Sequence, residues 1–146
     1  MKFFCDVNVY RLAKYLRFAG FDTMTRKELS IQQISYICKK EKRIFITRKK
    51  KSAKGLFCNE NNNLPKIEVL DYDSYLQQIK SILTKYPINH NLIATRCLKC
   101  NVLLKQFAEN PDKPTILYCS RCGKKFWKGT HYLNMLKVVE SLNISH

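Results

Sequence analysis

The sequence predicts an α/β protein in which a parallel sheet flanked by helices is followed by a small β unit and a final helix. Short apolar runs of strand type alternate with segments of helical periodicity up to about residue 90, an order typical of parallel sheets. Beyond that point stand two Cys-x-x-Cys pairs, which indicate a metal-stapled appendage. We therefore expect two domains, residues 1–90 and residues 91–146.

The first two elements are an apolar strand at Lys2–Cys5 and a helix over about residues 8–19, with Gly20 as its C-cap. Helical periodicity divides this helix into two faces. The inner face is predicted to carry Leu12, Leu16 and Ala19. The outer face is predicted to be a basic stripe of Arg11, Lys14 and Arg17.

Three further strands are expected, over residues 21–25, 43–47 and 66–70. Ser30 and Gln33 have the spacing of a capping box, which predicts a helix that begins there and runs to about Lys42. Another helix, capped by Asp71 or Asp73, is predicted to end before residue 87, a proline. This order predicts a parallel sheet but does not distinguish between the doubly wound folds.

The last third of the chain contains the pattern Cys97-x-x-Cys100 and Cys119-x-x-Cys122, followed by Gly123. Two such knuckles supply the four thiolates of a tetrahedral zinc site, and their separation is typical of a zinc ribbon. Gly123 occupies a position where a left-handed backbone is often needed. Two disulfides or a redox dithiol are the alternatives, and nothing in the sequence favours either.

The remaining cysteines, Cys5, Cys38 and Cys58, are interpreted as core or surface thiols rather than ligands. Ribbon strands are expected near residues 102–107, 115–119 and 125–128, with an exposed loop over residues 110–114. Thr130 is expected to cap a final helix. The inward side of that helix is predicted to carry Leu133, Leu136 and Val139.

A basic, aromatic segment, residues 124–131, follows the second knuckle directly. Together with residues 3–6 and 12–23, it resembles the Mut-seven C-terminal RNase domain family. The resemblance covers about residues 2–135 and is looser between residues 52 and 93. It implies a PIN-like nuclease fold, a parallel sheet flanked by helices, joined to a C-terminal zinc ribbon.

The resemblance also implies a catalytic site in which clustered carboxylates hold magnesium or manganese. Asp6 and Asp22 match two of the family's acids, although Asp6 also suits a helix cap and Asp22 a turn. The family's Thr-Arg-Asp is replaced by a sequence ending in Lys49, and the acids expected near Ser30 are missing. A lysine there removes a ligand and repels a divalent cation. We expect Lys49 to point into the old pocket, paired with Asp6 or holding a phosphate.

The net charge of +16, from 27 basic and 11 acidic residues, favours a polyanionic partner. Solvated surface lysines are the alternative explanation for part of it. Trp127 is predicted either to stack on a base or to pack against the neighbouring domain, and His131 to cap a helix or contact RNA. The candidate RNA contacts are Arg11, Lys14, Arg17, Arg48, Lys49, Lys50, Lys51, Lys54, Lys124, Lys125, Trp127, Lys128 and His131.

Three functions are kept open: a non-catalytic RNA-binding protein, an active metal-dependent endoribonuclease, and a protein-binding adaptor. The first is favoured, as a component or factor of a ribosome-like particle with ribosomal RNA and proteins as partners. Zinc is expected as a structural cofactor, with magnesium or manganese only if the nuclease is active. No apolar run is long enough to span a membrane. Free cysteines favour an intracellular reducing compartment, the cytoplasm first, with an organelle left open.

Overall fold

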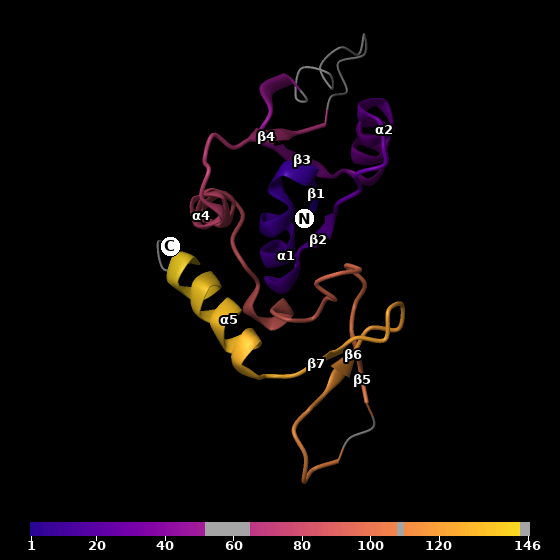
Figure 1. Cartoon of the computed structure of the whole chain (residues 1–146), viewed down its shortest axis with the longest axis vertical. Helices are drawn as coiled ribbons and strands as arrows, with labels where there is room; N and C mark the ends of the chain where they lie inside the picture. The colour runs from indigo at the N-terminus through magenta and orange to yellow at the C-terminus, as the bar shows by residue number, and fades with distance from the viewer. Residues whose placement is uncertain (52–64, 108–109, 144–146) are drawn as a thin grey trace.

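The computed structural model describes residues 1–51, 65–107 and 110–143. Its main sheet has four parallel strands in the order β2-β1-β3-β4 (Figure 1). The strands are β1 (Lys2–Cys5), β2 (Asp22–Met24), β3 (Ile44–Thr47) and β4 (Ile67–Val69). Phe3 pairs with Thr23 on one side and with Ile44 on the other. The predicted α/β class and each of its strands are confirmed.

Helices cover both faces of this sheet. They are α1 (Tyr10–Phe18), α2 (Ile31–Glu41), α4 (Tyr75–Lys85) and α5 (Thr130–Asn143), with short 3-10 helices η1 (Val7–Val9) and η2 (His90–Leu92). Alternation along β1 sends Phe3 and Cys5 into one core with α1, α4 and α5, and sends Phe4 into a second core under α2. The sheet is therefore enclosed on both sides.

Local signals explain where two of the helices begin and end. Ser30 and Gln33 form the predicted capping box at the start of α2. Helix α1 ends before Gly20, which has φ +99°, and a Cβ there would lie 2.5 Å from the Cβ of Leu92. Only glycine allows this close approach. The predicted aspartate cap of α4 is wrong, because Ser74 precedes the helix and no side chain caps it.

The ribbon is a three-stranded antiparallel sheet made of β5 (Lys105–Gln106), β6 (Leu117–Tyr118) and β7 (Lys125–Phe126). After it, α5 returns to pack against α1 and α4 (Figure 1), where Met135 and Val139 are buried in the main core. Leu133 is 56% exposed, so its predicted inward position is wrong. Thr130 is the first helical residue rather than the cap, since Leu133 N–H donates to the carbonyl of Gly129. In the part of the chain that the structure describes, no helix has the length and apolar character needed to cross a bilayer.

Candidate metal centre and strand-end site

The four paired cysteines come together between the two knuckles. Their sulfur atoms all lie within 4.8 Å of one another, and the Sγ atoms of Cys97 and Cys122 are 3.8 Å apart. A tetrahedral zinc ion with Zn–S bonds of about 2.3 Å separates its sulfurs by about 3.8 Å. None of the four is in a disulfide. The donor set and its spacing therefore fit a metal ion such as zinc, and the two-disulfide alternative is not observed.

Backbone amides support both knuckles in the same way. Cys100 N–H donates to the sulfur of Cys97, and Cys122 N–H donates to the sulfur of Cys119; each N···S distance is 3.4 Å. Burial raises the pKa of the Cys119 thiol, but hydrogen bonds from the amides of Cys122 and Arg121 and from the Cys122 and Cys97 thiols outweigh it and lower this pKa to about 7.

Arg17 lies on the buried side of α1, so its predicted place in the outer basic stripe is wrong. Its side chain donates from Nε to the carbonyl of Thr23 at 2.8 Å. Its Nη1 donates to the carbonyls of Leu98 and Lys99, at 2.7 and 3.2 Å. These two carbonyls belong to the first knuckle. Arg17 therefore attaches that knuckle to the sheet, and being 4% exposed it is no longer a candidate for RNA contact.

Asp22 is far from Asp6, contrary to the shared site that the resemblance implies. Asp22 is the first residue of β2 and pairs with Lys2 at the amino-terminal end of the strands, whereas Asp6 follows the carboxyl end of β1. At about 3.3 Å per residue, roughly 13 Å of strand separates them. The Asp22 carboxylate accepts from Arg43 at 2.8 Å and from Asn101 at 2.7 Å. Burial raises the pKa of Asp22, but these two donors outweigh it and lower the pKa overall.

Asn101 connects the first knuckle to the edge of the sheet. Its Oδ1 accepts from the Thr23 N–H at 2.9 Å, and its Nδ2 donates to Asp22. Strand β2 is an edge strand, so Asn101 satisfies a backbone donor that would otherwise lack a sheet partner. Sequence reasoning missed Asn101, although an asparagine placed directly after a Cys-x-x-Cys pair is a signal that could have identified it.

Asp6 lies at the carboxyl end of β1, as predicted, and its carboxylate is occupied by protein donors. One oxygen accepts from the Val7 N–H at 2.8 Å and so caps η1, the alternative role considered for this residue. The other accepts from the Thr47 hydroxyl at 2.7 Å and from the Asn8 amide at 3.2 Å. Among the described residues, no three acids come together, and the four cysteines are the only group with metal-binding spacing.

Lys49 does not pair with Asp6. Its backbone N–H donates to the Thr47 hydroxyl, and its exposed side chain has no ion pair within the described residues. Arg48 forms an exposed ion pair with Asp73, whose side chain is almost fully in solvent. The exposed candidates at this end of the sheet are therefore Arg11, Lys14, Arg48, Lys49, Lys50 and Lys51. Lys54 and Cys58 lie outside the described residues, as do most of the polar residues around them.

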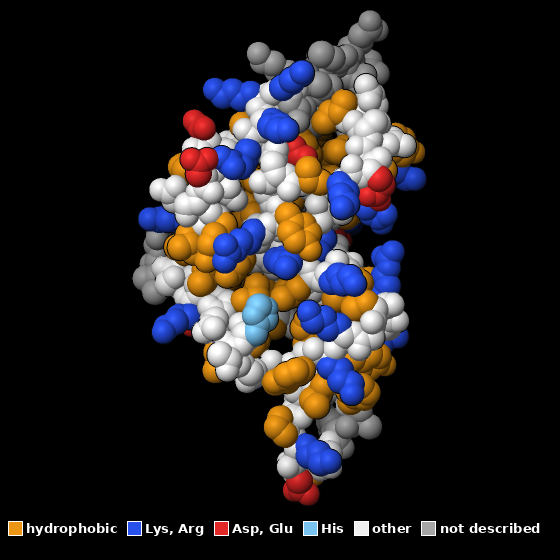
Figure 2. Space-filling view, viewed as in Figure 1, with side chains coloured by type: hydrophobic (Ala, Val, Ile, Leu, Met, Phe, Trp, Pro, Cys, Tyr) orange, Lys and Arg blue, Asp and Glu red, His pale blue; other side chains and the backbone are white. Residues whose placement is uncertain are grey.

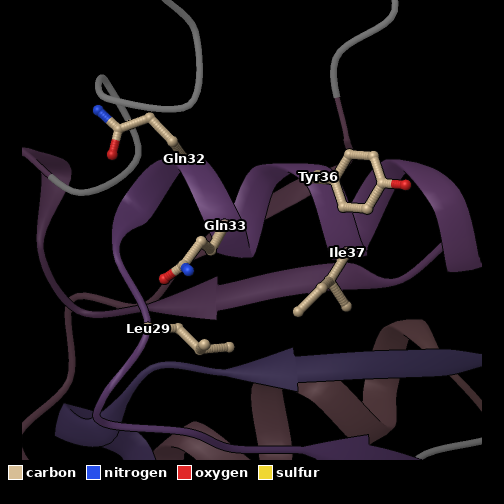
Figure 3. A pocket seen from close by; sticks show the side chains of 5 residues that line it. All are labelled: Leu29, Gln32, Gln33, Tyr36 and Ile37. Atoms are coloured by element: carbon tan, nitrogen blue, oxygen red, sulfur yellow. The ribbon is translucent and has the colours of Figure 1, made fainter.

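The start of α2, where the resemblance implies further acids, has a different character. Figure 3 shows Gln32, Tyr36 and Ile37 on this helix, with Leu29 before it, lining a shallow and largely apolar hollow. Gln33, which also lines it, completes the capping box through the backbone N–H of Ser30 at 2.8 Å. The residues that line this surface include no carboxylate, the charged oxygen ligand that a magnesium-dependent nuclease site needs.

The ribbon places its predicted contact residues on the surface. Trp127 is 61% exposed, so packing against the neighbouring domain is not observed. Lys124, Lys125 and Lys128 are also exposed. His131 is exposed on the first turn of α5 and is not part of the cysteine cluster.

Comparison with known proteins gives one match. The model of the Mut7-C RNAse domain matches residues 1–139. The chain belongs to the Mut7-C RNAse domain family. Neither the curated proteins nor the solved structures gave a match. Membership in the Mut7-C family indicates an RNA-related function, and this member carries Lys49 and the Ser30–Gln33 capping box at the two places where carboxylates are expected.

Proposed function

We propose that this Mut7-C protein binds RNA without cutting it, on a nuclease scaffold that has lost its metal-binding acids. The observation that carries this proposal is the isolation of Asp6. Its oxygens already accept three protein hydrogen bonds, and Asp22 is paired with Arg43 at the opposite end of the strands. Two-metal hydrolysis needs several carboxylates around ions about 3.5–4 Å apart. One engaged carboxylate does not meet that need.

The surface charge supports RNA as the partner. Lys and Arg side chains are spread over the face seen in Figure 2, and acidic side chains are few there. Near the carboxyl ends of the strands, Cζ of Arg11 lies 3.5 Å from the centroid of the Tyr75 ring. This cation–π contact holds the guanidinium in place at the surface. Arg48 and Lys49 follow β3 at the same end. A phosphate backbone laid across this end of the sheet would meet cations in place of the metal ions of a nuclease.

We propose zinc as the ion at the cysteine cluster, with a structural role. Four cysteines close a tetrahedral site, which leaves no open position for catalysis. Cys97, Cys100, Cys119 and Cys122 would each bind as thiolates. Arg17 stands beside the first knuckle and offsets part of the net negative charge of a four-thiolate zinc site.

The test is a cleavage and binding assay on the same preparation. Purified protein, labelled RNA, and magnesium or manganese are expected to give a complex and no products above background. Lys49→Asp restores a carboxylate and is expected to raise magnesium affinity, without cleavage, because the acids near α2 are also missing. Cleavage that disappears in Asp6→Asn would establish an active nuclease and overturn the proposal. Failure to bind any RNA would favour the adaptor alternative.

A basic scaffold that holds RNA without cutting it suits a component or factor of a large RNA–protein particle, such as a ribosome. Co-sedimentation of the tagged protein with such particles, reversed by high salt, is the expected result. If the tagged protein sediments separately from the particles even at low salt, this part of the proposal is wrong. The reducing compartment and the division at residue 90 stay predictions.

A further inference from the structure

One face of the ribbon alternates aromatic and basic side chains in register. Lys105, Tyr118 and Lys125 pair directly across β5, β6 and β7, so their side chains share a face. The same register continues beyond the strands, because Phe107 N–H donates to the carbonyl of Ile116 at 3.2 Å. Trp127 lies two residues beyond Lys125, and alternation therefore brings it to this face as well.

Ring contacts confirm that Phe107, Tyr118 and Lys125 share this face. The rings of Phe107 and Tyr118 have centroids 4.7 Å apart, and the Lys125 ammonium lies 5.4 Å from the centre of the Phe107 ring. Trp127 is 61% exposed and Phe107 is 44% exposed. We name this surface the ribbon platform. It consists of Lys105, Phe107, Ile116, Tyr118, Lys125 and Trp127.

We propose that the ribbon platform binds unpaired nucleotides, with bases stacked on Phe107 and Trp127 and the neighbouring phosphates held by Lys105 and Lys125. This rests on the proposed RNA-binding function and names the form of RNA recognised. Stacking on an aromatic side chain strengthens binding for each base that stacks, and it requires a base with a free face. In a duplex those faces are already stacked, so this surface would select single strands.

Charge favours a nucleic acid over a protein as the occupant. The two lysines of the ribbon platform flank its rings, and the platform contains no Asp or Glu. Gly129 contributes to the shape, since a Cβ there would lie 2.7 Å from Nε1 of Trp127. The indole is thus held beside the backbone at Gly129 while most of its surface stays in solvent.

The experiment uses full-length, metal-loaded protein and a labelled single strand of about ten nucleotides, free or annealed to its complement. Trp127 is the only tryptophan in the chain, so its fluorescence reports stacking directly. Quenching by the single strand, with weaker binding and little quenching by the duplex, is expected. Phe107→Ala and Trp127→Ala should each weaken single-strand binding at least about fivefold while leaving the salt dependence unchanged, because no phosphate contact is lost.

The matched control is Tyr36→Ala on α2, an aromatic of similar exposure with a lysine, Lys40, 5.8 Å from its ring. It should leave binding unchanged. Equal binding of single strand and duplex with Trp127 unquenched, or an equal loss in the control, overturns the platform while RNA binding itself stands. No binding of either RNA overturns the proposed function instead. Zinc content and thermal unfolding of each variant show that the platform variants are folded.

Discussion

The two knuckles of the cysteine cluster share a backbone and differ in their surroundings. In each, the residue after the second cysteine has a left-handed backbone, with φ +69° at Asn101 and +78° at Gly123. Each also donates its N–H to the carbonyl of the knuckle's first cysteine, at 2.9 and 2.8 Å. Asn101 then bonds to the sheet through its side chain, whereas a Cβ added at Gly123 would have no atom within 4 Å other than those of Gly123 and its two chain neighbours.

This comparison shows how one local motif can serve two purposes. The conformation of the knuckle is fixed by its own backbone hydrogen bonds, so the side chain at the left-handed position is free to vary. An asparagine there makes the first knuckle a docking element for the α/β sheet, and a glycine leaves the second knuckle supported by the metal ligands and short strands. The stability of the two knuckles should therefore depend on different groups.

Removal of the metal should have the largest effect and should separate the two knuckles. Binding energy at such sites is about 10–16 kcal/mol and is coupled to folding. With a strong chelator, amides of β6, β7 and the second knuckle should lose protection from hydrogen exchange, while the Thr23 N–H bonded to Asn101 keeps more of its protection. Chelator saturated with zinc is the control. If the Thr23 N–H loses as much protection from exchange as the amides of the second knuckle, the proposed difference between the knuckles is contradicted.

Arg17→Met should have the next largest effect, because it leaves three backbone carbonyls without their donor. We expect a loss of about 3 kcal/mol in the free energy of unfolding, measured with denaturant, and weaker zinc binding in a competition assay. Lys14→Met, on the exposed side of the same helix, is the control and should cost little. Unchanged zinc affinity in Arg17→Met would show that Arg17 stabilises the sheet alone.

Asp22→Asn should reveal a pH-dependent contribution to the same junction. The folded state lowers the pKa of Asp22, so its stabilisation is present above the unfolded value of about 3.9 and is lost as the pH falls through the lower folded value. The variant should be less stable by about 2 kcal/mol near pH 7, and the difference should shrink below about pH 4. Asp73→Asn, at an exposed ion pair, should show almost no difference at either pH. If the difference in the free energy of unfolding between the wild type and Asp22→Asn persists in acid, the ionised carboxylate is not its source.

Gly123→Ala should have the smallest effect. Its Cβ would meet no neighbour, so only the left-handed backbone is strained, at a cost of about 1 kcal/mol. The same substitution at Gly20 should cost several times more, since the added atom would collide with Leu92. Thermal unfolding of both variants measures the contrast. Equal shifts would mean that backbone strain dominates at both sites.

Much of the fold could be predicted from the sequence because its signals are local. Strand patterns, the Ser30 capping box and the left-handed Gly20 each depend on a few neighbouring residues. The caps predicted for α4 and α5 were wrong, although they are local features. The error at Arg17 concerns contacts between distant segments. Arg17 is buried by carbonyls about 80 positions away, and periodicity within one helix carries no information about them. The cysteine cluster was predictable because the spacing of its ligands is itself a local pattern.

The strand-end site was predicted less well for a related reason. Recognising Asp6 and Asp22 as acids of a nuclease does not show at which edge of the sheet each lies. That depends on whether the residue precedes or follows its strand, and on a register that sets Asp22 beside Lys2. The replacement at Lys49, in contrast, was visible directly in the sequence, although the direction of its side chain was not.

The return of α5 to the main core has a consequence for how the protein is made. Met135 and Val139 share a core with Phe3, and Tyr132 stacks edge-on against Phe18 at 5.5 Å. A ribosome adds these residues about 130 positions after the first strand, so the core that α1 and α4 form with the sheet is completed only after the ribbon has been synthesised. The four cysteines precede α5 in the chain and therefore leave the ribosome before it. A metal ion bound at these cysteines would hold the ribbon folded before α5 completes the core, so zinc supply during translation would influence how much of the chain matures.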